Sequence, residues 1–138
     1  MAMVGKSLPD LNLPALIGGG IEPLKGSATG PTLVTLFASW CGPCAEEAPA
    51  LMALKAEGVR IVGIAYKDPP ADSVDFLRRY GDPYAKVLMD RDGRGGIELG
   101  VTGVPETLAV DRAGVIRGKL AGPLTAQAAE SLLESAGR

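Results

Sequence analysis

The sequence contains no histidine and only two cysteines among its 138 residues. A structural zinc site needs four nitrogen or sulfur ligands, so a zinc site here would require a dimer that shares its ligands. The chain also has no basic cluster, which argues against nucleic acid and against an anionic membrane surface as binding partners. We therefore expect neither a metal nor another cofactor, and we expect proteins or small thiols as partners.

The residues that are present describe an ordinary folded chain. Hydrophobic residues make up 46% and charged residues 22%, with a formal net charge of -2. This balance is typical of globular rather than disordered proteins, and the length suits one domain with a substantial core. We predict a single domain over residues 1–138 that is a monomer. The first ten residues contain no apolar stretch long enough for a signal peptide or a transmembrane helix.

The two cysteines, Cys41 and Cys44, lie three positions apart, directly after the hydrophobic run from Thr32 to Phe37. This order predicts a strand that ends before Cys41 and a helix that begins near it. The first turn of a helix favours a thiolate, because its N–H groups are unpaired and the helix dipole is positive there. A purely structural disulfide across so short a loop would stabilise the fold little. We interpret Cys41 as the exposed attacking thiol and Cys44 as the deeper, resolving thiol.

Strand and helix patterns alternate along the chain, which is typical of a parallel sheet covered on both faces. Predicted strands cover residues 32–37, 60–65, 86–89, 107–111 and 115–120, and predicted helices cover 41–57, 71–80 and 125–136, with a brief helix within 90–99. The last two strands form a hairpin with Gly114 in its turn. Glycines after Pro14 predict another hairpin at the amino end. The expected fold is therefore α/β, with a mixed sheet.

These elements, with Cys-Gly-Pro-Cys at a helix start and Pro105 before a late strand, resemble the thioredoxin fold. Four strings narrow the resemblance: Gly63-Ile-Ala-Tyr-Lys-Asp68, Tyr80-Gly-Asp-Pro-Tyr84, Gly100-Val-Thr-Gly-Val-Pro-Glu-Thr107 and Ala121-Gly-Pro-Leu-Thr125. They are similar to strings in the membrane-tethered thiol:disulfide oxidoreductases of cytochrome c maturation, the CcmG or DsbE type. Related TlpA and ResA proteins share less of this set.

The resemblance implies a periplasmic reductase held in the inner membrane by one amino-terminal helix, so we expect that an anchor has been removed from this chain. Such a protein keeps the haem-attachment cysteines of apocytochrome c, or a disulfide of a maturation partner, reduced. Its electrons come from a membrane thiol reductase. Two alternatives remain open: a general thioredoxin or TlpA-like reductase, and a binding module or chaperone in which the cysteines are incidental.

Glu47 is the candidate proton acceptor. Thr35 stands where thioredoxin has a buried aspartate, and a threonine cannot act as a base. Glu47 follows Cys44 by three residues, so the two side chains share a face of the predicted helix. We hypothesise that Glu47 takes the proton of Cys44, the role that relatives assign to a glutamate at this position. The alternative is that Glu46 and Glu47 only complement the positive end of the helix.

The resemblance also implies a substrate groove, made by Trp40, Gly42, Pro43, Val104, Pro105 and Glu106. The Val104-Pro105 peptide is expected to be cis, which offers the Val104 main chain to an extended partner segment. The alternative for Trp40 is a position in the core. Glu106 is expected at the groove rim, where simple solvation is the alternative to substrate selection.

Two further departures from the related sequences lie near this groove. Thr102 and Leu108 stand where relatives often have tyrosine and phenylalanine, and the Gly42-Pro43 pair is that of thioredoxin itself. Tyr66, Lys67 and Asp68 end a strand at the same edge of the sheet as Cys41. Asp68 is a possible cap of the next helix, and we do not predict that it is catalytic.

Overall fold

The computed structural model describes residues 3–138; Met1 and Ala2, the first residues of the predicted domain, lie outside the described residues. Strands and helices alternate in the predicted order. The strands are β1 (Asn12–Pro14), β2 (Ile21–Pro23), β3 (Thr32–Phe37), β4 (Arg60–Tyr66), β5 (Lys86–Asp90), β6 (Glu106–Val110) and β7 (Ile116–Ala121). The helices are α1 (Gly42–Ala56), α2 (Pro70–Tyr80), α3 (Arg94–Glu98) and α4 (Ala126–Ser135). Within residues 3–138, no helix combines the length and the apolar character that a membrane crossing needs.

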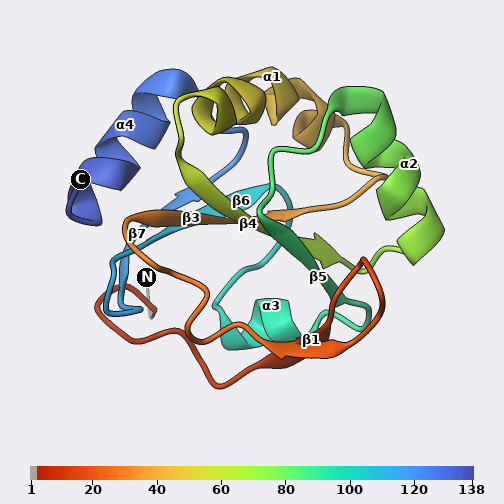
Figure 1. The fold of residues 1–138 in the computed structure, drawn as a ribbon, viewed down its shortest axis with the longest axis horizontal. Helices are drawn as coiled ribbons and strands as arrows, with labels where there is room; N and C mark the ends of the chain where they lie inside the picture. The colour runs from red at the N-terminus through yellow and green to blue at the C-terminus, as the bar shows by residue number, and fades with distance from the viewer. Residues whose placement is uncertain (1–2) are drawn as a thin grey trace.

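The central sheet has five strands in the order β5-β4-β3-β6-β7. Strands β3, β4 and β5 are parallel, whereas β6 and β7 run antiparallel to their neighbours. Helices α1, α2 and α4 cover one face of this sheet, and α3 with the β1–β2 hairpin lies on the other (Figure 1). This arrangement confirms the predicted thioredoxin-like α/β fold with a mixed sheet.

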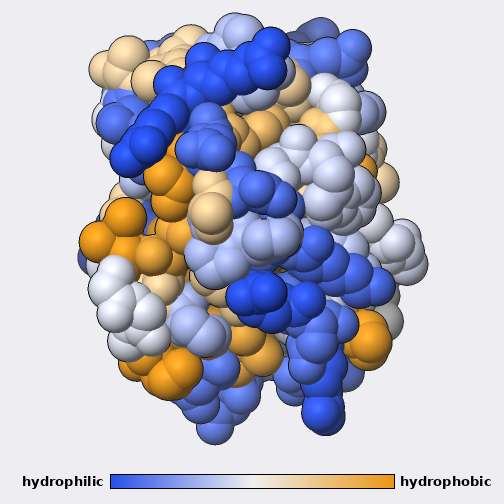
Figure 2. Space-filling model, turned by 90° about the vertical axis from the view of Figure 1, so that its right-hand side faces the viewer, coloured by the Kyte–Doolittle hydropathy of each residue, from blue (hydrophilic) through white to orange (hydrophobic). Residues whose placement is uncertain are grey.

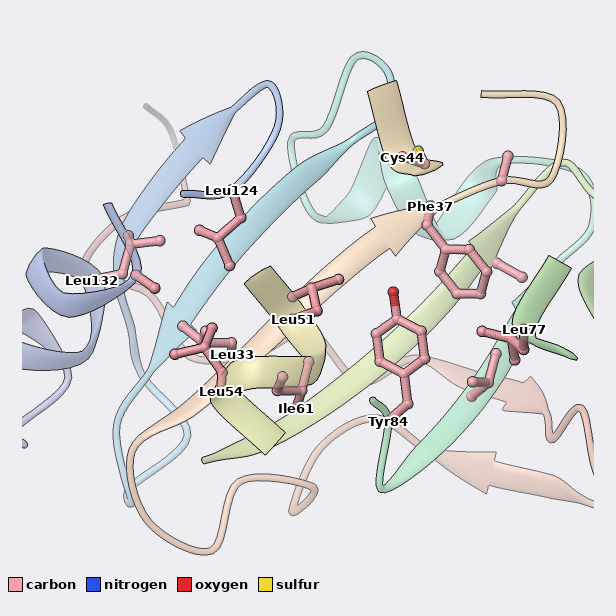
Figure 3. Close-up of a cluster of buried hydrophobic side chains, with 14 of the residues drawn as sticks. Leu33, Phe37, Cys44, Leu51, Leu54, Ile61, Leu77, Tyr84, Leu124 and Leu132 are labelled. Atoms are coloured by element: carbon pink, nitrogen blue, oxygen red, sulfur yellow. The ribbon is translucent and has the colours of Figure 1, made fainter. Parts of the chain in front are cut away.

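Alternating strand residues divide the core between the two faces, because successive side chains on a strand point to opposite sides. The helix-covered side contains the strand residues Leu33, Ile61, Val87 and Ala109, and the hairpin side contains Val34, Val62, Leu88 and Leu108. Both cysteines belong to the helix-covered cluster, which also contains Phe37 and Tyr84. Figure 3 shows Cys44 with these two rings. The dithiol is therefore attached to the main packed core.

The predicted amino-terminal hairpin is confirmed: β1 and β2 are antiparallel partners. Its first strand continues onto the sheet, where Ala15 bridges Leu88 and the Leu16 N–H donates to the Val87 carbonyl at 2.8 Å. The hairpin thus covers the otherwise open edge of β5. Seen from the side of α2 and β5, the surface shows hydrophobic residues in small groups among hydrophilic ones (Figure 2).

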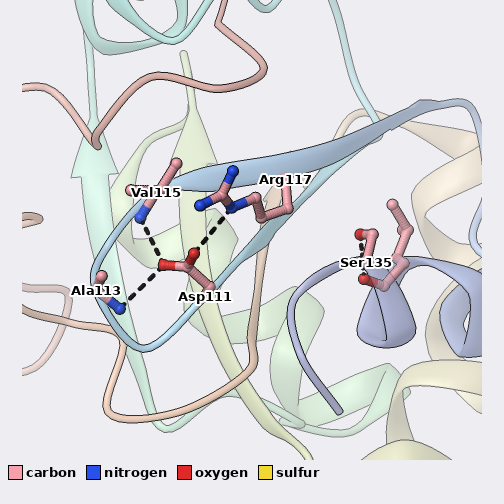
Figure 4. Close-up of polar contacts among 6 residues, drawn as sticks. Asp111, Ala113, Val115, Arg117 and Ser135 are labelled. Atoms are coloured by element: carbon pink, nitrogen blue, oxygen red, sulfur yellow. Dashed lines mark hydrogen bonds and ion pairs between the residues drawn. The ribbon is translucent and has the colours of Figure 1, made fainter.

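The β6–β7 turn is built around Asp111 (Figure 4). Its carboxylate accepts hydrogen bonds from the main-chain N–H of Ala113 at 2.9 Å, from that of Val115 at 3.0 Å and from Arg117 Nε at 2.9 Å. The hydrogen bond from Val115, followed by that from Arg117, holds the pKa of Asp111 below its ordinary value. Gly114 lies in this turn, as predicted, and has a positive φ of +83°. Because β6 runs antiparallel to β3, this turn lies at the opposite end of the sheet from the cysteines.

Candidate active site

Cys41 and Cys44 form a disulfide at the start of α1, with their Cα atoms 5.3 Å apart. Cys41 is the N-cap residue, and its sulfur accepts the main-chain N–H of Cys44 at 3.2 Å. An N–H donor at this sulfur stabilises the thiolate that Cys41 becomes on reduction. Helix α1 continues to Ala56 with Pro49 inside it.

The prediction of an exposed Cys41 is wrong for this disulfide form. Cys41 is 6% exposed and Cys44 is 2% exposed. Both sulfur-bearing residues are packed in the apolar cluster that also contains Phe37 and Ala38. Gly42 and Pro43, which lie between the two cysteines, are exposed in contrast. Within residues 3–138, no group of three His, Cys, Asp or Glu side chains is placed to hold a metal ion.

Glu47 is almost completely buried, with 1% exposure. One carboxylate oxygen accepts the main-chain N–H of Leu124 at 2.9 Å, while the other has no hydrogen-bond partner among residues 3–138. Burial raises the pKa of Glu47 from 4.5 to about 7, and the Leu124 N–H offsets only part of this effect. A buried carboxyl group of this pKa exchanges protons readily near neutral pH. Glu46, in contrast, is exposed on the outer face of α1.

Tyr84 is buried in the same cluster as the two cysteines. Its ring stacks on Phe37 with centroids 5.0 Å apart, and Figure 3 shows its hydroxyl on the side of Cys44. Burial, followed by the negative charges of Glu47 and Asp82, raises the pKa of Tyr84 well above its ordinary value. The tyrosine therefore stays neutral. The sequence predicted no role for Tyr84, because its string only supported the family resemblance.

Thr35 lies in the middle of β3, at the position where thioredoxin has its buried aspartate. It is fully buried, and its hydroxyl lies 3.3 Å from that of Thr107 on the neighbouring strand β6. The two hydroxyl groups satisfy each other across the sheet. Glu47 is thus the buried carboxyl group on the helix that carries the dithiol.

Trp40 is 59% exposed, so the alternative of a core position is wrong. Its indole Nε1 donates a hydrogen bond to the main-chain carbonyl of Lys67 at 3.1 Å. Lys67 adopts a left-handed backbone conformation with φ of +48°, which turns the chain sharply after β4. An exposed aromatic ring held by a turn is suited to contact a partner protein.

Asp68 is 1% exposed and lies next to the cysteine segment. Its carboxylate accepts hydrogen bonds from the Ser39 N–H at 3.1 Å, the Ser39 hydroxyl at 2.7 Å and the Ser73 hydroxyl at 2.6 Å. The considered role as a main-chain cap of α2 is wrong, because Pro69 is the N-cap and Asp68 binds serine side chains and the Ser39 main chain instead. No spacing rule in the sequence links Ser39 to Asp68, so sequence reasoning missed this contact.

The Val104-Pro105 peptide is cis, as expected. The pairing of Leu36 on β3 with Glu106 on β6 places Pro105 beside Phe37, at the end of the strand that leads to Cys41. Val104 is half-buried and packs against the cluster that contains both cysteines. The structure therefore brings Val104 and Pro105 to the cysteine end of the sheet.

Glu106 is buried at 3% exposure, so the predicted place at a solvated rim is wrong. One carboxylate oxygen accepts the main-chain N–H groups of Thr102 at 3.0 Å and Gly103 at 3.1 Å. The other lies 3.1 Å from Lys119 Nζ, and Lys119 also donates to the Gly100 carbonyl at 2.6 Å. This ion pair connects β7 to the loop before Pro105, and the spacing of thirteen residues gave no sign of it in the sequence.

Comparison with known proteins agrees with this site. The profile of the Redoxin family matches residues 3–135, nearly the whole chain. The chain belongs to the Redoxin family. This Redoxin chain is 41% identical over 127 residues to the thiol:disulfide interchange protein DsbE of Allochromatium vinosum, covering 91% of this chain and 70% of the relative. It is 40% identical over 127 residues to HelX of Rhodobacter capsulatus, covering 90% and 71% respectively.

Solved structures show the same fold. A crystal structure from Chlorobium tepidum, assigned as a thiol:disulfide interchange protein DsbE, superposes with a TM-score of 0.79 and 27% identity over 96% of both chains. The structure of MTB DsbF has a TM-score of 0.80 and 23% identity, covering 91% of this chain and 94% of that one. The predicted DsbE-type resemblance is confirmed, and this Redoxin protein is a thiol:disulfide oxidoreductase of the thioredoxin fold.

Proposed function

We propose that this protein reduces the disulfide of apocytochrome c, or of a partner in its maturation, in the periplasm. The observation that carries the proposal is Cys41 at the N-cap of α1, with the buried, high-pKa carboxyl group of Glu47 one turn beyond Cys44. Its likeness to the thiol:disulfide interchange proteins DsbE and HelX supports a role in disulfide exchange. A membrane thiol reductase returns the electrons, and an amino-terminal helix anchors the full-length protein in the inner membrane.

The reaction proceeds by two thiol–disulfide exchanges. In the reduced protein, the Cys41 thiolate attacks one sulfur of the partner disulfide, and the other partner sulfur leaves as a thiolate. The Cys44 thiolate then attacks the Cys41 sulfur, so that the Cys41–Cys44 disulfide forms and the partner leaves with two reduced sulfurs. Two electrons pass to the partner, whose thiolates take up protons.

Glu47 serves the second exchange. Cys44 must lose its proton before it attacks, and it is buried at 2% exposure, away from bulk water. The unpaired oxygen of Glu47 is a base on the same face of α1, and a pKa of about 7 matches the pH at which it has to work. Glu47 receives the Cys44 proton as the thiolate forms.

The partner segment binds beside the disulfide. We assign Trp40, Gly42 and Pro43 to one wall and the main chain of Val104 next to the cis Pro105 to the other. An extended segment that carries a disulfide pairs with the Val104 main chain as an added strand would. Glu106 supports this second wall without facing the partner, because its buried carboxylate accepts hydrogen bonds from the N–H groups of Thr102 and Gly103.

Trapping of the mixed disulfide tests the function. In Cys44→Ala the first exchange proceeds and the second cannot, so partners accumulate on Cys41 as covalent adducts. The experiment expresses the anchored protein in a bacterium that makes c-type cytochromes, and identifies the adducts by mass spectrometry. We expect apocytochrome c or a maturation protein. Cys41→Ala/Cys44→Ala is the matched control and captures nothing. A Cys44→Ala protein that traps no partner would refute the enzyme proposal.

Two alternatives give different results in the same strains. A general thioredoxin or TlpA-like reductase would leave c-type cytochromes intact when the gene is deleted, whereas the proposed function requires their loss. A binding module or chaperone would retain its phenotype in Cys41→Ser, because its cysteines would be incidental. Thr102 and Leu108 stand near the groove where relatives often have tyrosine and phenylalanine. Because these differences bear on the choice of substrate, the deletion experiment is the more informative of the two.

A further inference from the structure

The segment that delivers the attacking cysteine is held from the side by the turn after β4. Ser39 and Trp40 lie between the end of β3 and Cys41, and both are hydrogen-bonded to that turn. The Asp68 carboxylate receives the N–H and the hydroxyl of Ser39, and the Lys67 carbonyl receives the Trp40 indole. Both residues before the nucleophile are therefore attached to two consecutive residues of another element.

We propose that Asp68 is a positioning residue for disulfide exchange: its carboxylate fixes Ser39, and through Ser39 it fixes the ring of Trp40 and the place from which Cys41 attacks. Asp68 does not touch the reacting sulfurs and takes no proton. The inference concerns the exchange reaction itself, so it is independent of which protein is the partner.

Three features of the contact support this role. Asp68 is 1% exposed, and hydrogen bonds to a buried carboxylate are shorter and stronger than those between neutral groups. Its third hydrogen bond, from the Ser73 hydroxyl at 2.6 Å, attaches the carboxylate to α2. The Asp68 carboxylate is therefore held by a helix and not only by a loop. The Cys41 N–H in turn donates to the Ala38 carbonyl at 3.3 Å, which closes the segment from the other side.

Attack geometry explains why the anchor matters. A sulfur must approach a disulfide in line with the bond that breaks, and a misplacement of about 1 Å costs on the order of 100-fold in rate. Without the Asp68 carboxylate, Ser39 loses both of its hydrogen bonds to the turn after β4, and the Trp40 ring retains one hydrogen bond to a turn that is itself less firmly held. We expect a loss of about 10-fold in the rate of Cys41 attack.

Trp40 is the only tryptophan, so its fluorescence reports on the anchor directly. The experiment compares Asp68→Ala, Asp68→Asn and Ser39→Ala in the reduced state, by acrylamide quenching and fluorescence anisotropy of Trp40. The rate of attack is measured on oxidised glutathione and on a synthetic peptide with a Cys-x-x-Cys disulfide. Asp111→Asn is the matched control, because it removes an aspartate that also accepts turn N–H groups, at the far end of the sheet.

We expect faster quenching, lower anisotropy and about 10-fold slower attack on both disulfides in Asp68→Ala. Asp68→Asn keeps one oxygen acceptor for the Ser39 N–H and restores most of the rate, and Ser39→Ala is intermediate. Asp111→Asn matches the unmodified protein. Wild-type quenching and rate in folded Asp68→Ala would overturn the proposal, as would an Asp68→Asn as slow as the alanine variant. If Asp68→Ala does not fold, unchanged fluorescence and rate in Ser39→Ala overturn it equally.

Discussion

Replacement of Glu47 by glutamine should change how stability depends on pH. Glutamine has nearly the same shape, keeps an oxygen to accept the Leu124 N–H and cannot ionise. In the folded protein burial raises the pKa of Glu47 from 4.5 to about 7. The carboxyl group thus binds its proton more tightly in the folded chain than in the unfolded chain.

The sign follows from proton uptake. Between pH 4.5 and about 7 the folded protein holds a proton on Glu47 that the unfolded chain has lost, so the free energy of unfolding falls as the pH rises. The stabilising effect of the neutral form is complete below pH 4.5 and is lost as the pH passes about 7. At about 1.4 kcal/mol for each pH unit, the total change attributable to Glu47 is about 3 kcal/mol.

Urea unfolding of the oxidised protein measures this effect, because the cysteines do not titrate while they form a disulfide. The free energies of unfolding of Glu47→Gln and the unmodified protein are compared at pH 4.5 and pH 8. Their difference should shift by about 3 kcal/mol in favour of Glu47→Gln at pH 8, since all other carboxylates cancel. Glu46→Gln, at an exposed position on the same helix, is the control and should show no shift. A difference between Glu47→Gln and the parent that is the same at both pH values would refute the reasoning.

Three other substitutions test the packing around the site. Lys119→Met leaves the Glu106 carboxylate buried without its cation and should lower the free energy of unfolding by about 3 to 5 kcal/mol. Much of this loss should be recovered in the double variant Lys119→Met/Glu106→Gln. No recovery in urea unfolding would contradict the role of the ion pair. Gly63→Ala places a Cβ 2.9 Å from the Tyr84 ring and should cost about 1 to 3 kcal/mol in the same assay, so an unchanged midpoint would be inconsistent with this contact. Thr125→Ala removes the side-chain cap of α4 and should lower the thermal midpoint through a loss of about 1 kcal/mol, whereas Thr125→Ser should retain it.

The fold and the dithiol could be predicted because local sequence signals determine them. Apolar runs with turn residues between them marked β3 to β7, and the predicted boundaries differ from the structure by at most one residue. The place of Cys41 at the start of α1 follows from Gly42 and Pro43, which suit the first helical turn. The predicted cis Val104-Pro105 peptide came from the family resemblance rather than from spacing.

What could not be predicted depends on contacts between distant segments. The Lys119–Glu106 ion pair and the Ser39–Asp68 hydrogen bonds join residues on separate elements, and no periodicity connects them. The burial of Glu106 was missed for the same reason: a glutamate is rarely buried unless it is paired, and its partner Lys119 lies on β7. The sequence did not decide whether Trp40 is exposed or buried, because the tryptophan follows a fully buried strand.

The structure also sharpens the electrostatic role of Glu47. A fully ionised carboxylate one turn from the dithiol would oppose the Cys41 thiolate, but a carboxyl group with a pKa of about 7 is only partly charged at neutral pH. In the proposed mechanism its charge depends on the step: Glu47 is neutral after it accepts the Cys44 proton and charged after it returns the proton to water.

The reduction potential of the Cys41–Cys44 pair tests the central claim most directly. The protein is equilibrated with glutathione buffers of known ratio, and the fraction of disulfide is measured by alkylation of the free thiols. A reductant of partner disulfides should have a potential of roughly -200 mV or lower, near or below the glutaredoxin range, so that electrons flow from the dithiol to the partner. A potential near that of a strong oxidant, about -120 mV, would contradict the proposed direction of electron flow.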